Sequence, residues 1–119
     1  MKLELSKGYA EIRDFCPVGP YRKYQRTLLD GVGFDNDDDN KKKRPSLGVS
    51  IDAQMVLVVE MTLKIVLNEK ETVFDGKSFE ENRKFIDDNL SVKDYIIIRE
   101  KCTELKDAAY LEAEPKKKS

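Results

Sequence analysis

The residues whose types could support chemistry are concentrated in one stretch, residues 34–45, with the sequence FDNDDDNKKKRP. Three aspartates match the first three ligand positions of an EF-hand calcium loop: Asp35, Asp37 and Asp39. The sixth position of that loop needs a glycine and the twelfth a bidentate glutamate, but Asn40 and Ser46 stand there. The match fails where the motif is most demanding, so we expect no metal site.

Basic residues form two groups in the chain. One follows the aspartates directly, and the other lies in the helix expected over residues 20–32; their members are Lys41, Lys42, Lys43 and Arg44, and Arg22, Lys23 and Arg26. The run at 41–44 has no interleaved aromatic side chain that could stack on bases, and the preceding aspartates offset its charge. We therefore interpret both groups first as solvated surface and do not expect nucleic-acid binding.

Enzyme chemistry finds little support in the composition. The chain has no histidine, which removes the commonest general base and metal ligand. No glycine-rich phosphate loop, nucleophile elbow or carboxylate pair is evident. Cys16 and Cys102 stand far apart without C-x-x-C spacing, which indicates reduced thiols, at least one of them buried. We expect a protein without enzymatic activity and without a cofactor.

The charge balance bears on location and partners. Lysine and arginine number 22 against 23 acidic residues, for a net charge of −1, which argues against general binding of polyanions. The first residues carry charges where a secretion signal needs an apolar run. No stretch approaches the roughly 20 apolar residues that cross a bilayer. We expect a soluble cytoplasmic protein that does not bind membranes.

The sequence patterns predict an α+β, mostly helical fold, with an N-terminal β-hairpin followed by about four helices. Apolar residues alternate over residues 2–15 around a turn at Ser6-Lys7-Gly8, as in a hairpin with one apolar face. Pro20 suits the start of the next helix, and Gly31 and Gly33 end it. We expect one small domain over residues 1–114.

Two charged segments complete the predicted organisation. Residues 34–49 have the polar, charge-segregated composition of a mobile loop. Residues 115–119 form a basic tail that we expect to be disordered.

The segment 51–68, IDAQMVLVVEMTLKIVLN, allows two interpretations. Its β-branched residues and the alternation in EMTLKIV favour strands, with a turn near Asn68-Glu69-Lys70. As a helix, it would place Glu60, Lys64 and Asn68 on one polar strip with glutamate before lysine. We prefer the helix, because the polar strip would otherwise be a coincidence.

The C-terminal third predicts two capped helices. Ser78 and Glu81 have the spacing of a capping box, and Ser91 caps the last helix with Asp94 in its first turn. In the first of these helices, Phe79, Ile86 and Leu90 share an apolar face. Spacings of three and four then define a buried stripe on the last helix: Tyr95, Ile98, Cys102, Leu105 and Ala109.

Ile96 and Ile97 lie off that stripe on either side. They give the last helix more apolar surface than one packing partner needs, so we take them as candidate partner-binding residues together with Arg22, Lys23 and Arg26.

The order of these elements resembles the tail assembly chaperones of long-tailed (siphovirus-like) bacteriophages. The resemblance covers nearly the whole chain. Its motifs are a leucine-rich strand, a glycine turn and an aliphatic–arginine–acid strand, then a leucine-containing cap before the last helix; here these are Leu3, Leu5, Gly8, Ile12, Arg13 and Asp14, then Leu90, Ser91, Asp94 and Tyr95.

The resemblance implies a binding function without chemistry. Such a chaperone acts in the cytoplasm of the infected bacterium, keeps the tape measure protein soluble, helps recruit tail tube subunits and is not retained in the virion. Self-association stays open. The alternatives are a structural head–tail or tail completion protein of the virion and a small nucleic-acid-binding regulator.

Overall fold

The computed structural model describes residues 1–32 and 47–113, which fold into an antiparallel four-stranded sheet and four helices. Along the chain the elements are β1 (Lys2–Leu5), β2 (Gly8–Ile12), α1 (Val18–Val32), α2 (Leu47–Met61), β3 (Thr62–Leu67), β4 (Lys70–Val73), α3 (Phe79–Asn89) and α4 (Val92–Ala113). The predicted class, α+β and mostly helical with an N-terminal hairpin, is confirmed. A second hairpin, β3–β4, was not part of the preferred prediction.

The sheet has the strand order β1-β2-β3-β4, and its register separates two faces. Leu5, Ala10, Ile12 and Ile65 are buried in the core. On the opposite side, which we call the outer sheet face, two cross-strand rows lie side by side: Lys2, Glu11, Lys64 and Val73, and Glu4, Tyr9, Val66 and Glu71. This alternation is typical of a sheet with one buried and one solvated side.

The segment 51–68 divides between the two interpretations. The helix α2 ends at Met61, and β3 begins at Thr62 without an intervening loop. The preferred prediction of one helix through residue 68 is therefore wrong for residues 62–68, and the strand interpretation, with its turn at Asn68 and Glu69, is correct there. The central position of β3, hydrogen-bonded to β2 on one side and β4 on the other, outweighs the local helical pattern.

The predicted polar strip is accordingly absent from the described helices. Glu60 contacts Lys23 of α1, with 3.2 Å between Oε1 and Nζ. Lys64 instead donates to Glu71 across the β3–β4 pair, at 3.3 Å. Glu60 and Lys64 therefore each contact a residue of another element and not each other.

The end of α2 is closed by groups from elsewhere in the chain. The last carbonyls of a helix have no intrahelical partner. Here the Thr62 hydroxyl donates to the carbonyl of Val58 at 2.7 Å. Arg13 donates from its main-chain N to the carbonyl of Met61 at 2.9 Å and from Nε to the carbonyl of Glu60 at 3.2 Å. Arg13, which follows β2, thereby fixes the point at which α2 becomes β3.

Two predicted boundaries need correction. The helix α1 begins at Val18, two residues before Pro20, which is buried in its first turn. The first turn tolerates proline because the N–H that proline lacks would have no helical partner. The helix α2 begins at Leu47, so residues 47–49 are helical and do not belong to the loop predicted over 34–49. The aspartates that partly match a calcium loop, the basic run Lys41 to Arg44 and the predicted tail 115–119 lie outside the described residues.

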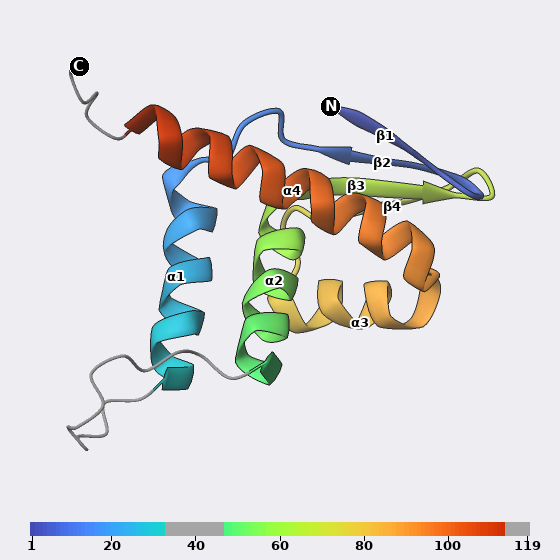
Figure 1. Cartoon of the computed structure of the whole chain (residues 1–119). Coiled ribbons are helices and arrows are strands. Elements are labelled where there is room, and N and C mark those ends of the chain that lie inside the picture. The colour runs from blue at the N-terminus through green and yellow to red at the C-terminus, as the bar shows by residue number, and fades with distance from the viewer. Residues whose placement is uncertain (33–46, 114–119) are drawn as a thin grey trace, which may run out of the picture.

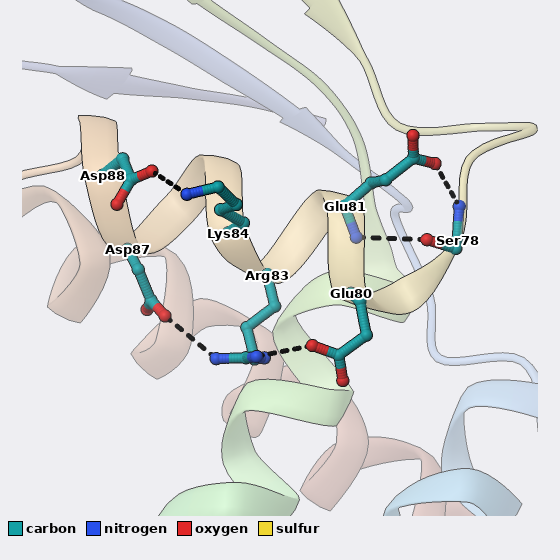
Figure 2. A network of polar contacts seen from close by, with 7 residues as sticks. All are labelled: Ser78, Glu80, Glu81, Arg83, Lys84, Asp87 and Asp88. Atoms are coloured by element: carbon teal, nitrogen blue, oxygen red, sulfur yellow. Dashed lines mark hydrogen bonds and ion pairs between the residues drawn. The ribbon is translucent and has the colours of Figure 1, made fainter.

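The predicted caps of α3 and α4 are confirmed. The Ser78 hydroxyl accepts from the main-chain N of Glu81 at 3.1 Å, and the Glu81 carboxylate accepts from the main-chain N of Ser78 at 3.0 Å (Figure 2). The exposed face of α3 carries further ion pairs, with Arg83 between Glu80 and Asp87 and with Lys84 beside Asp88 (Figure 2). These pairs one turn apart support the helix on the side that faces water.

At the start of α4, the Ser91 hydroxyl accepts from the main-chain N of Asp94 at 3.1 Å. The buried Asp94 carboxylate accepts from both the main-chain N and the hydroxyl of Ser6, at 3.1 and 2.8 Å. The cap of the last helix is thereby joined to the turn of the first hairpin, 88 residues away.

Figure 1 shows α1 and α2 side by side, with α4 running across both. The predicted stripe of α4 faces the core: Ile98 and Cys102 are buried, and Tyr95, Leu105 and Ala109 pack against the same cluster. Both cysteines are buried free thiols, as predicted. The opposite side of α4 carries the exposed residues Glu100, Glu104, Asp107 and Leu111.

Candidate protein-binding surface

The five predicted partner-binding residues do not form one surface. Ile96 and Ile97 are half-buried near the start of α4, and Ile97 packs against the core. Arg22 and Arg26 are exposed on α1, and Lys23 joins α1 to α2 through Glu60. Figure 1 shows α1 lying below the C-terminal half of α4, whereas the two isoleucines belong to its N-terminal half.

A different surface is hollowed where α4 crosses α2. This α2–α4 groove has a volume of about 880 Å³ and is lined by apolar side chains of both helices together with polar and charged ones. Its walls come from two helices: Ser50, Ile51 and Gln54 of α2, and Arg99, Glu100, Thr103, Glu104, Asp107, Ala108 and Leu111 of α4. Ile51 is 53% exposed and Leu111 68% exposed. Two large aliphatic side chains thus stand in water at one concave site.

Three acidic side chains rise from the α4 wall of the groove. Each has a basic neighbour on α4: Arg99 with Glu100, Lys101 with Glu104, and Lys106 with Asp107. In every pair the acid is the more exposed member; the Lys106 side chain is 15% exposed and that of Asp107 60%. The charge presented to a partner on this wall is therefore mainly negative.

Lys106 is the least exposed of the three basic side chains. Its Nζ lies 4.7 Å from the centre of the Tyr24 ring on α1, a cation–π contact, and 2.9 Å from Oδ1 of Asp107. Burial disfavours the cation, but the contacts with Asp107 and Tyr24 outweigh burial and raise the pKa of Lys106 above its ordinary range. The lysine thus holds α4 on α1 and remains charged.

A second hollow lies on the other side of the C-terminal end of α4. This α1–α4 pocket, about 230 Å³, is lined by Cys16, Val18, Tyr21, Ala109 and Tyr110. Val18 and Tyr110 are largely exposed, and so is Phe15 nearby in the sequence. Burial raises the pKa of the Cys16 thiol, an effect that the Lys106 cation reduces. A protonated thiol is a poor nucleophile, so this pocket suits apolar contact better than covalent chemistry.

Neither a cluster of metal-binding side chains nor a membrane-spanning helix is found in the part of the chain that the structure describes. Residues 1–32 and 47–113 contain no group of three histidine, cysteine, aspartate or glutamate side chains that could hold a metal ion. Within the same ranges, no helix has both the length and the apolar content needed to span a membrane.

The α2–α4 groove is not among the sites predicted from the sequence, although the residues of its α4 wall have a recognisable spacing. Glu100, Glu104, Asp107 and Leu111 are spaced four, three and four residues apart, so they share one side of α4. Ile96 lies four residues before Glu100 and extends that side toward the start of the helix. Ile51 could not have been added from sequence, because it meets this side only through the crossing of α2 and α4.

Comparison of the chain with models of protein families, with curated proteins and with solved structures finds no match.

Proposed function

We propose that this chain is a non-enzymatic chaperone that binds an apolar, helical client protein during assembly. Following the resemblance to phage tail assembly chaperones, we propose that the client is the tape measure protein and that binding takes place in the cytoplasm of the infected bacterium. The chaperone also helps recruit tail tube subunits and leaves before the virion is complete.

The observation that carries this proposal is the α2–α4 groove. Ile51 and Leu111 expose large aliphatic side chains at one hollow, while the opposite side of α4 is fixed to the core by Ile98 and Cys102. Large apolar side chains exposed at one hollow of an ordered scaffold are typical of a protein-binding site. Amphipathic helices commonly bind by laying their apolar side in such a groove.

The openness of the surface suits a client that must later be released. The groove and the α1–α4 pocket lie on either side of the C-terminal part of α4, and neither encloses a deep anchor site. Contacts of this kind are individually weak, so affinity depends on many of them and can be overcome by a competing subunit.

The test is co-expression with the tape measure protein of the same genome, measuring the soluble fraction of that client. We expect the chain to bring the client into a soluble complex that co-purifies, and the double variant Ile51→Ser, Leu111→Ser to lose this ability. Leu29→Ser is the matched control, because Leu29 is 61% exposed on α1 outside the groove.

A client that stays insoluble, with nothing co-purifying, would refute the proposal. Mass spectrometry of purified virions then decides the leading alternative, since a head–tail or tail completion protein would be found in the particle and a chaperone would not.

A further inference from the structure

We propose that the α2–α4 groove recognises an amphipathic helix whose apolar stripe is flanked by lysine or arginine residues. This inference rests on the proposed function and specifies the chemistry of the client segment.

The acidic wall supplies the first half of the recognition. Glu100, Glu104 and Asp107 lie on one side of α4, and their side chains are 71%, 67% and 60% exposed. At about 1.5 Å per residue, the three carboxylates follow the helix axis for roughly 10 Å. A partner helix with basic residues at spacings of three and four would present cations along the same length.

The apolar lining supplies the second half. Ile51 stands on the α2 wall, Leu111 on the α4 wall, and the small side chain of Ala108 also lines the groove. Aliphatic side chains along the stripe of a partner helix would cover these exposed residues by entering between the walls. Burial of these side chains provides affinity, and the charged wall favours one class of helix over another.

The basic segments of the chain itself match only the charged half. Lys41 to Arg44 precede the start of α2, and Lys116 to Lys118 follow the end of α4. Neither of these basic runs contains an aliphatic residue that could cover Ile51 or Leu111. We therefore favour a separate partner helix as the occupant.

The test uses two synthetic peptides with one leucine stripe at helical spacing, one flanked by lysines and the other by glutamates. Fluorescence anisotropy measures their binding to the full chain at low and high salt. We expect the lysine peptide to bind about tenfold more tightly or better at low salt, and its advantage to shrink as salt rises.

Substitutions then locate the binding. Removing the acidic wall with Glu100→Gln, Glu104→Gln and Asp107→Asn is expected to abolish the preference for lysine. The matched control, Glu80→Gln, Asp87→Asn and Asp88→Asn, removes three exposed acids of α3 and is expected to keep it. Ile51→Ser with Leu111→Ser is expected to weaken both peptides about tenfold.

Three results would overturn the inference: equal affinity for the two peptides, a preference that survives loss of the acidic wall, or binding that begins only after residues 114–119 are removed. The last would assign the groove to the basic tail of the chain. Co-expression separates this inference from the proposed function. If the triple acidic-wall variant still solubilises the client, only the charge recognition fails; if the lysine peptide binds but no client is solubilised, only the chaperone function fails.

Discussion

The outer sheet face and the α2–α4 groove both contain charged and apolar side chains, but these side chains differ in their contacts and in their exposure to water. On the sheet, Lys64 donates to Glu71, the Lys2 ammonium lies 4.3 Å from the centre of the Tyr9 ring, and the N-terminal ammonium lies 3.5 Å from Glu11. The charged groups on this face thus contact partners on neighbouring strands. In the groove, the basic side chains are less exposed than their acidic partners, and the acids and two aliphatic residues face water.

The difference shows that overall charge balance does not decide whether a surface is available to a partner. A partner that approaches the sheet must disrupt contacts already made, which costs part of what it gains. A partner that approaches the groove also meets ion pairs, but their carboxylates are more exposed than their cations, and uncovered apolar side chains line the same site.

The largest effect on stability is expected at Gly8, where the main chains of β2 and β3 leave no room for an added side chain. A Cβ added to Gly8 would overlap the main-chain carbonyl of Val66, at the close approach of β2 and β3. We expect Gly8→Ala to lower the free energy of unfolding by roughly 3 kcal/mol or more, because a main-chain atom cannot move aside without disturbing the register. Urea denaturation monitored by circular dichroism measures the change.

Gly19→Ala is the control for this prediction, since a Cβ at Gly19 in α1 has open space around it. It should cost nothing and can stabilise slightly, as alanine favours the helix. Equal effects of the two substitutions would show that the approach of β2 to β3 is looser than described. Peptide binding per folded molecule should survive Gly8→Ala, because the groove shares no residue with the sheet.

A second, smaller effect on stability concerns Cys102, whose side chain lies on the core side of α4. Burial of the Cys102 thiol on the core side of α4, reinforced by nearby Cys16, raises its pKa from an ordinary 9.0 to about 12. Between these values the unfolded chain loses a proton that the folded chain retains. The free energy of unfolding should therefore fall as pH rises above about 9, by up to ~1.4 kcal/mol per pH unit from this group.

Urea denaturation between pH 8 and 11 measures that slope, and Cys102→Ala should make it shallower while other titrating groups are unchanged. Below pH 9 the thiol is protonated in both states, so the slopes of the two proteins should coincide there. Identical slopes above pH 9 would mean that water reaches Cys102 and that α4 is less firmly seated than its contacts indicate.

The sequence predicted best what depends on neighbouring residues. The capping box of Ser78 and Glu81 and the Ser91 cap are formed by hydrogen bonds within three residues, so their spacing alone identifies them. The buried stripe around Ile98 and Cys102 follows equally from helical periodicity.

The helix-to-strand change at Thr62 could not be predicted in this way. It depends on the pairing of β3 with β2 and on Arg13, whose guanidinium reaches the carbonyl of a residue 47 positions later. The groove was missed for a related reason: the spacing of Glu100, Glu104 and Asp107 is visible in the sequence, but Ile51 joins them only in the folded chain. Contacts between distant segments decided both features.

The smallest effect is expected from a single ion pair on the outer sheet face. The hydrogen bond and charge of Glu71 raise the pKa of Lys64 above its ordinary range. The pair therefore contributes stability at neutral pH, and this contribution is lost as pH rises through the raised pKa of the lysine. Glu71→Gln should return the pKa of Lys64 toward its ordinary value, which NMR titration of the lysine Cε and Nζ signals measures. If Lys64 titrates identically in the two proteins, the cross-strand pair does not persist in solution, and the sheet's charges are then as available to a partner as those of the groove.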